Sequence, residues 1–306
     1  MRASLRRTCL IISSWLAASL GSDAFAEDEP LRAYFVGNSV TDTINYRGLA
    51  SLAKSRGKTL AWGRHMIPGA PLSWIWQHPK DGFQQEPFGH YPKALNEYAW
   101  DVLSLEPFDR HLDDDDLAMT RNFIDLALKR NPDVQIFIYS RWPRRANGKE
   151  GAFVLDYRTK WFRQYTGAFD GTEETRDYFE RLVAELRKAY EGKAKPFLLV
   201  PVGDVLLELD ARMKADKIPG YSDISQLYTD WIHLTNVGSY AVGLTFYATL
   251  FKDDPRGLPF EPYHEKLDRV HGDRPITPPL ATAIQEAVWK IVSKHALAGV
   301  AEVKAR

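Results

Sequence analysis

Short hydrophobic runs alternate with amphipathic stretches along most of this chain. Five runs have the length and composition of buried strands, at residues 33–36, 59–62, 100–105, 134–139 and 197–200. Longer segments repeat apolar residues at helical spacing, at 46–54, 117–129, 175–190, 205–213, 237–250 and 281–295. Strands that are buried on both faces are nearly continuous hydrophobic runs. The alternation therefore predicts an α/β fold with a five-stranded parallel sheet covered by helices on both faces.

The first 26 residues have a different pattern. Arg2, Arg6 and Arg7 precede an apolar run at 10–20, and Ala24-Phe25-Ala26 follows it. A positive region, a short apolar region and an A-x-A site are typical of a secretory signal peptide, and the run is too short for a membrane-spanning helix. We expect cleavage after Ala26 and a periplasmic or secreted protein; an uncleaved N-terminal anchor is the alternative.

The amino-acid composition argues against several classes of function. The only cysteine, Cys9, lies in the predicted signal peptide, so we expect no disulfide and no thiol chemistry in the mature chain. Without residues 1–26 the 40 basic and 40 acidic residues become 37 and 39, a net charge of −2. This balance does not favour nucleic acid or a membrane surface as partner. The sequence leaves the oligomeric state open.

Residues 27–306 read as one domain, because no Gly/Ser-rich linker or internal repeat divides them. Ligands of parallel sheets bind beyond the carboxyl ends of the strands. Four strand ends carry turn or polar residues that can line one crevice, at Ser39, the loop around Gly69, Glu106 and Arg141. Neither a phosphate-binding glycine motif nor a histidine spacing typical of metal ligands occurs, so we expect no cofactor and no metal.

The first strand ends in Gly37-Asn38-Ser39, a turn signal. A serine at a tight strand-to-helix turn has an exposed hydroxyl, and nearby backbone N–H groups without partners suit an oxyanion. Ser39 is therefore a candidate nucleophile. The alternative is an ordinary turn with a helix cap.

Near the other end, Asp230-Trp231-Ile232-His233 precedes the helical segment at 237–250. A serine nucleophile needs an imidazole to take and return its proton, and a carboxylate to orient that imidazole. Asp230 and His233 can supply both groups. A packed structural histidine and a capping aspartate are the alternatives.

Together the two motifs resemble those of the SGNH/GDSL hydrolase family, whose first block is Gly-Asp/Asn-Ser and whose last block is Asp-x-x-His. The resemblance implies a flavodoxin-like three-layer α/β/α sandwich and metal-free ester hydrolysis. It also implies Ser39 as nucleophile, His233 as base and Asp230 as its orienting carboxylate.

The middle blocks of the family match this chain less closely. Gly69 corresponds to the glycine whose N–H joins the oxyanion hole, alongside the Ser39 N–H and the Asn38 side chain as further donors. The family's usual third-block asparagine is replaced by Glu106, and a carboxylate there repels an oxyanion unless it is protonated or turned away.

Aromatic and basic residues follow the predicted strands, and flat aromatic faces and arginines suit sugars and their acidic groups. We expect substrate contacts from Trp74, Trp76, Glu106, Arg141 and Trp142, with residues 142–174 forming an insertion or lid. Packing of these tryptophans onto the sheet is the alternative. The sequence as a whole predicts a secreted serine esterase that removes acyl groups, acetyl first, from a carbohydrate. A non-catalytic carbohydrate-binding protein and a lipase or lysophospholipase of the same fold are the rival hypotheses.

Overall fold

The computed structural model describes residues 29–107, 116–145, 156–167, 174–264 and 272–300. The predicted signal peptide, and part of the predicted insertion at 142–174, lie outside these residues.

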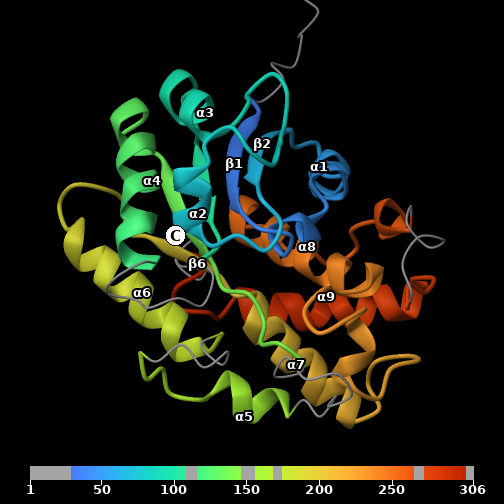
Figure 1. The fold of residues 1–306 in the computed structure, drawn as a ribbon. Coiled ribbons are helices and arrows are strands. Elements are labelled where there is room, and N and C mark those ends of the chain that lie inside the picture. Colours follow the sequence, from blue (N-terminus) through green and yellow to red (C-terminus); the bar gives the residue numbers. More distant parts are fainter. Residues whose placement is uncertain (1–28, 108–115, 146–155, 168–173, 265–271, 301–306) are drawn as a thin grey trace, which may run out of the picture.

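A central sheet organises the molecule (Figure 1). Its strands are β1 (Leu31–Gly37), β2 (Leu60–Met66), β3 (Phe83–Gln84), β4 (Val102–Leu105), β5 (Gln135–Tyr139) and β6 (Leu198–Val200), in the spatial order β3-β2-β1-β4-β5-β6. All neighbours pair in parallel except β2 and β3. The five parallel strands follow the flavodoxin-like order 2-1-3-4-5, which confirms the predicted fold class.

The sixth strand was not predicted. β3 is a two-residue strand that pairs antiparallel with the end of β2 through His65 and Met66. A segment this short carries no periodicity that a sequence pattern can reveal.

Helices cover both faces of the sheet (Figure 1). One layer contains α1 (Tyr46–Lys54), α7 (Val202–Lys214), α8 (Asn236–Phe251) and α9 (Pro278–Val292), which pack on one another. The other contains α2 (Leu72–Gln77), α3 (Tyr91–Glu97), α4 (Leu117–Arg130) and α6 (Arg176–Ala189). The short α5 (Tyr157–Trp161) contacts α7, and 3₁₀ helices η1 (Thr41–Ile44), η3 (Ile224–Leu227) and η4 (Glu261–Tyr263) lie in connections. The result is a three-layer α/β/α sandwich.

The long helices begin and end close to the predicted positions, and α6 and α8 begin at threonine caps. Thr175 caps α6 by accepting a hydrogen bond from Tyr178 N–H at 3.2 Å. Thr235 caps α8 in the same way, and almost every residue of α8 is buried. The unpredicted helices α2, α3 and α5 have only five to seven residues, too few for a clear helical repeat.

His65 on β2 is a buried histidine whose two ring nitrogens are both used. Its Nε2 lies 2.9 Å from Asp81 O, and its Nδ1 accepts a hydrogen bond from Tyr91 N–H at 3.3 Å. Burial, with a smaller contribution from His90, lowers the pKa of His65 from 6.5 to about 4. The folded protein therefore holds this ring neutral.

The protonation of His65 predicts a loss of stability in mild acid. Above pH 6.5 neither state protonates this ring, whereas between pH 6.5 and about 4 the unfolded chain binds a proton that the folded protein refuses. Over this range the contribution of His65 to the free energy of unfolding falls by up to about 3 kcal/mol. Urea unfolding at pH 7.5 and at pH 5 should give a smaller pH-dependent loss for His65→Asn than for the unchanged protein. Equal losses in the two proteins would contradict this assignment.

Candidate active site

The turn after β1 presents Ser39 at the carboxyl edge of the sheet. Asn38 O accepts a hydrogen bond from Thr41 N–H at 3.0 Å, and Asn38 Oδ1 accepts one from Val40 N–H at 3.0 Å. These bonds close a compact turn that continues directly into η1, a 3₁₀ helix. Asn38 is buried while Ser39 is half-buried, so the turn directs the serine outward.

A second compact loop presents the histidine. Asp230 Oδ1 accepts hydrogen bonds from the N–H groups of Ile232 and His233, both at 2.7 Å. Thr229 N–H donates to His233 O at 2.9 Å, which closes the loop immediately before α8. One carboxylate oxygen thus holds the loop and leaves the other oxygen for the imidazole ring.

Ser39, His233 and Asp230 lie in one hydrogen-bonded row. Ser39 Oγ is 2.8 Å from His233 Nε2, and His233 Nδ1 is 2.7 Å from Asp230 Oδ2. Partial burial by itself raises the pKa of Asp230, but hydrogen bonds from Ile232 N–H and from the His233 ring and N–H outweigh it and lower the pKa. An ionised Asp230 accepts the proton on Nδ1, so we infer the tautomer in which Nε2 can accept the Ser39 proton.

Two backbone N–H groups on adjoining turns donate no hydrogen bond within the described part of the chain. Among the residues that the structure describes, neither Ser39 N–H nor Gly69 N–H donates a hydrogen bond. Gly69 has φ +66° in the turn after β2, where Ala70 N–H donates to Ile67 O at 3.1 Å. Asn38 Nδ2 donates to Ala70 O at 3.4 Å, so the Gly69 turn lies against the Ser39 turn. The Asn38 side chain joins the two turns and faces the protein interior.

Glu106 lies behind the serine turn. Its Oε2 accepts a hydrogen bond from Asn38 N–H at 3.2 Å and another from the Thr41 hydroxyl. A Cβ on Gly37 would stand 2.7 Å from the same Oε2, so this close approach requires a glycine. Burial raises the pKa of Glu106, while Arg141 and these hydrogen bonds oppose the shift. The carboxyl group braces the turn from its buried side.

Arg141 extends this buried network toward the predicted insertion. Its Nε lies 3.7 Å from Glu106 Oε1 and its Nη2 lies 3.2 Å from Glu174 Oε1, with all three side chains at most 1% exposed. Arg144 Nε lies 3.1 Å from the same Glu174 oxygen. The charged groups neutralise one another inside the protein.

Trp142 supports the histidine loop. The side chain is fully buried, and its Nε1 donates a hydrogen bond to Ile232 O at 2.7 Å. Arg145 N–H donates to Trp231 O at 2.8 Å, next along the same loop. Glu106, Arg141 and Trp142, which the sequence predicts to contact substrate, thus have buried side chains that hold backbone segments in place.

The two remaining predicted contacts lie on α2. Trp76 stacks on Tyr91 with ring centroids 5.1 Å apart and meets the edge of Phe123, so it packs α2 onto α3 and α4. Trp74 is 50% exposed and stacks on His78 at 3.9 Å. Neither tryptophan lines the cavity beside Ser39.

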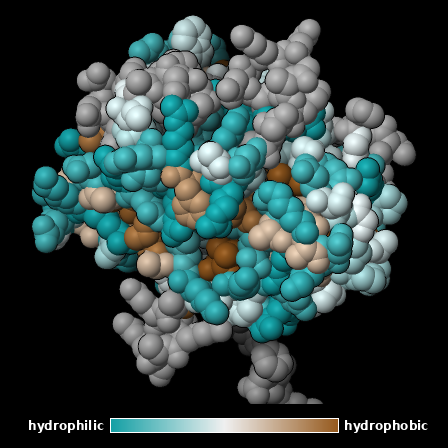
Figure 2. Space-filling model, turned by 90° about the horizontal axis from the view of Figure 1, so that it is seen from below, coloured by the Kyte–Doolittle hydropathy of each residue, from teal (hydrophilic) through white to brown (hydrophobic). Residues whose placement is uncertain are grey.

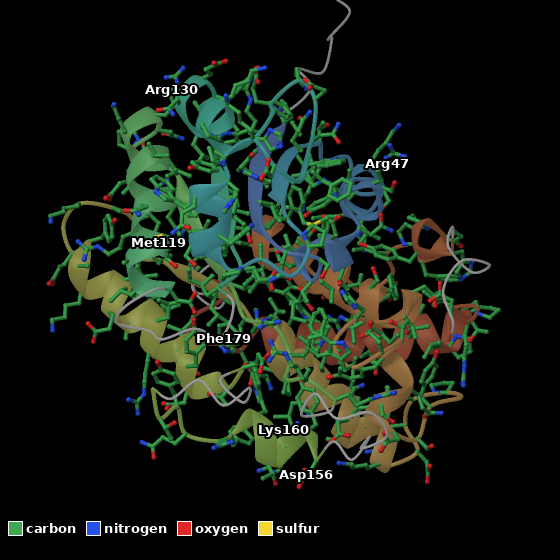
Figure 3. The ribbon with its side chains drawn as sticks, in the orientation of Figure 1. Arg47, Met119, Arg130, Asp156, Lys160 and Phe179 are labelled. Carbon is green, nitrogen blue, oxygen red and sulfur yellow. The ribbon has the colours of Figure 1, made fainter. Side chains whose placement is uncertain are left out.

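That cavity opens on the other side of the serine. It has a volume of about 800 Å³, and its wall includes Ser39, Asp230 and His233 together with residues of η1, α1 and β2. Lining residues that sequence reasoning missed are Asp42, Trp62, Arg64 and Gln85. Arg47, also in the lining, projects outward from α1 (Figure 3). None of these residues stands in a motif, so only the paired strands and helices bring them together.

The face seen from below in Figure 2, toward which β1 runs in Figure 1, is largely hydrophilic. Hydrophobic residues form small separate patches on it (Figure 2). Within the described ranges, no group of three or more His, Cys, Asp or Glu residues is arranged to hold a metal ion. In the same residues, no helix has the length and hydrophobicity needed to cross a bilayer.

No protein-family model matches the chain, and no curated protein matches its sequence. Among solved structures it is similar to a DUF4886 family protein from Bacteroides uniformis, with 16% identity and a TM-score of 0.57 over 87% of this chain and 96% of that one. A provisionally assigned GDSL-like lipase from Parabacteroides merdae has 14% identity and a TM-score of 0.45, over 71% of this chain and 94% of that one. The first likeness supports the fold alone, and the chemistry of the site rests on the residues of this chain.

Replacing Glu106 by glutamine tests the brace beneath the serine turn. Loss of the buried charge opposite Arg141 should lower the free energy of unfolding by about 3 kcal/mol in urea titrations. Glu180→Gln is the matched control, since Glu180 pairs with Arg176 at the surface with side chains 40% and 38% exposed. This control should change the same free energy by no more than about 0.5 kcal/mol. Similar small losses in both variants would contradict a bracing role for Glu106.

Proposed function

We propose that this chain is a serine ester hydrolase of the SGNH/GDSL type. The observation that carries the proposal is the row from Ser39 Oγ through His233 to Asp230, with distances of 2.8 and 2.7 Å. The three groups have the mutual geometry that nucleophilic catalysis by a serine requires. Ser39 and His233 are 194 positions apart in the chain and lie at hydrogen-bonding distance. If these residues only capped or packed their own loops, they would not need to contact each other.

The proposed reaction follows from these contacts. Ser39 Oγ attacks the acyl carbon of an ester while its proton moves to His233 Nε2, and a tetrahedral oxyanion forms. His233 then gives the proton to the departing alcohol oxygen, leaving an acyl group on Ser39. A water molecule repeats the sequence: its proton moves to His233, its oxygen bonds to the acyl carbon, and Ser39 regains the proton as the acid leaves. Asp230 stabilises the imidazolium in both halves of the reaction.

The N–H groups of Ser39 and Gly69 are the proposed oxyanion donors, since both lack a partner among the described residues and lie on adjoining turns. The Asn38 side chain holds those turns together and is proposed as a support for this pair of donors. Arg141 offsets the charge of Glu106, whose carboxyl group accepts a hydrogen bond from Asn38 N–H on the buried side of the turn.

An acylated carbohydrate is the proposed substrate, with acetyl as the first acyl group to test. The cavity of about 800 Å³ is larger than an acetyl group needs, and its polar side chains suit hydroxyl-rich ligands. A lipase would favour a continuous apolar cleft, whereas hydrophobic residues in Figure 2 lie in small patches. From the N-terminal pattern that ends at Ala26 we also propose export to the periplasm or beyond.

Replacement of the nucleophile is the direct test. The mature chain should release 4-nitrophenol from 4-nitrophenyl acetate, and Ser39→Ala should remove this activity. Asp230→Asn should lower kcat by about 10⁴-fold, because the imidazole loses the partner that sets its tautomer. Ser51→Ala, a substitution on the exposed face of α1, is the matched control and should leave kcat unchanged.

The rival functions give different results in the same assay. Activity that survives Ser39→Ala would remove Ser39 from the role of nucleophile. Binding of oligosaccharides without hydrolysis of any ester would favour a carbohydrate-binding protein, and preference for long acyl chains would favour a lipase. A screen of acetylated polysaccharides, with Ser39→Ala beside the unchanged protein, would identify the carbohydrate.

A further inference from the structure

One wall of the cavity is formed by alternate residues of β2. Trp62 and Arg64 lie two positions apart on a strand and therefore share one face of the sheet, the face covered by α1. The intervening Gly63 faces the other layer, where an added Cβ would meet Tyr34 and Trp100. The strand periodicity thus brings an indole and a guanidinium side by side into the cavity lining.

Aromatic rings surround this arginine. Trp62 stacks on Tyr46 of α1 with centroids 4.8 Å apart and planes at 17°. The Arg64 guanidinium carbon lies 5.6 Å from the Tyr46 ring centroid and 5.7 Å from that of Phe83 on β3. Phe83 is 52% exposed, so the short antiparallel strand extends this aromatic surface to the outside of the molecule.

Arg64 and Asp42 form an ion pair in the lining of the cavity. Arg64 Nη1 donates to Asp42 Oδ2, and the side chains are 21% and 28% exposed. The pair is therefore only partly buried, and its exposed part lies in the lining of the cavity. A partly exposed arginine–aspartate pair offers both donors and acceptors to the hydroxyl groups of a ligand.

The charges around the cavity favour a neutral ligand. Its acidic lining residues are Asp42, Asp230 and Asp273, and its basic ones are Arg47 and Arg64. Asp42 offsets Arg64 through their ion pair, and Asp230 is occupied by His233. The lining therefore provides no excess of positive charge to bind a carboxylate or a sulfate.

Asp42, Trp62, Arg64 and Phe83 together are named the β2 platform. We propose that the β2 platform binds a neutral sugar ring next to the residue whose ester reaches Ser39, so that the protein acts on oligosaccharides in preference to single acylated sugars. This inference rests on the proposed function. Asp42, Trp62 and Arg64 line the same cavity as Ser39, and Phe83 continues the platform beyond that lining through its contact with Arg64. Aromatic faces suit the apolar face of a pyranose ring, and the ion pair suits its hydroxyl groups.

The proposal predicts that kcat/KM depends on the chain length of the substrate. With partially O-acetylated xylotetraose, mannotetraose and cellotetraose as probes, kcat/KM of the unchanged protein should exceed that for the corresponding acetylated monosaccharide by at least tenfold for one sugar. Phe83→Ala and Trp62→Ala should each lower kcat/KM for that tetrasaccharide at least tenfold more than for 4-nitrophenyl acetate. Phe162→Ala is the control, an exposed phenylalanine outside the cavity that should alter neither value.

The outcomes separate the platform from the proposed function. If 4-nitrophenyl acetate is cleaved but no tetrasaccharide is preferred, the platform proposal is overturned while the esterase stands. Equal losses on large and small substrates in the platform variants would overturn it as well, as would a preference for an acetylated oligogalacturonate. If no ester is cleaved, calorimetric titration with the same tetrasaccharides decides: binding weakened by Phe83→Ala supports the platform, and absence of binding rejects it.

Discussion

The contact between the Glu106 carboxylate and the turn after β1 is the constraint on which the site depends. Glu106 Oε2 holds Asn38 N–H and the Thr41 hydroxyl, one on each side of Ser39. The approach is so close that residue 37 has no room for a side chain. Because the carboxylate is buried, it also needs a counter-charge, and Arg141 at the end of β5 supplies it. A bond that shapes one turn thereby links the ends of three strands, β1, β4 and β5.

The same region supports the histidine loop. Directly after Arg141, Trp142 donates to Ile232 O and Arg145 N–H donates to Trp231 O. The segment that neutralises Glu106 beneath the serine is thus continuous with the segment that positions His233. This continuity explains how two loops from distant parts of the chain keep a 2.8 Å separation between Ser39 Oγ and His233 Nε2. Ser39 also borders the cavity, whose lining includes residues of η1, α1 and β2.

Much of the architecture followed from local patterns. The five parallel strands and the six long helices were predicted because each carries its own run or repeat of apolar residues and, in α6 and α8, its own threonine cap. The short elements β3, α2, α3 and α5 escaped prediction, because they depend on packing against a formed sheet. Burial of predicted contact residues has a related cause. Arg141 and Trp142 have side chains typical of a sugar site, yet position in the fold buries them.

The sequence by itself determined the alternation of strands and helices, the compact turn at Gly37-Asn38-Ser39 and the loop at Asp230–His233, since each rests on residues that are neighbours in the chain. The sequence could not assign the role of Glu106. A carboxylate at this position suggested repulsion of an oxyanion, whereas its hydrogen bond from Asn38 N–H supports the turn after β1. Nor could the sequence locate the cavity, because Asp42, Trp62 and Arg64 share no motif. Only the tertiary structure decided these points. The role of a charged or aromatic side chain depends on its burial and its partners, and both arise from pairing between distant segments.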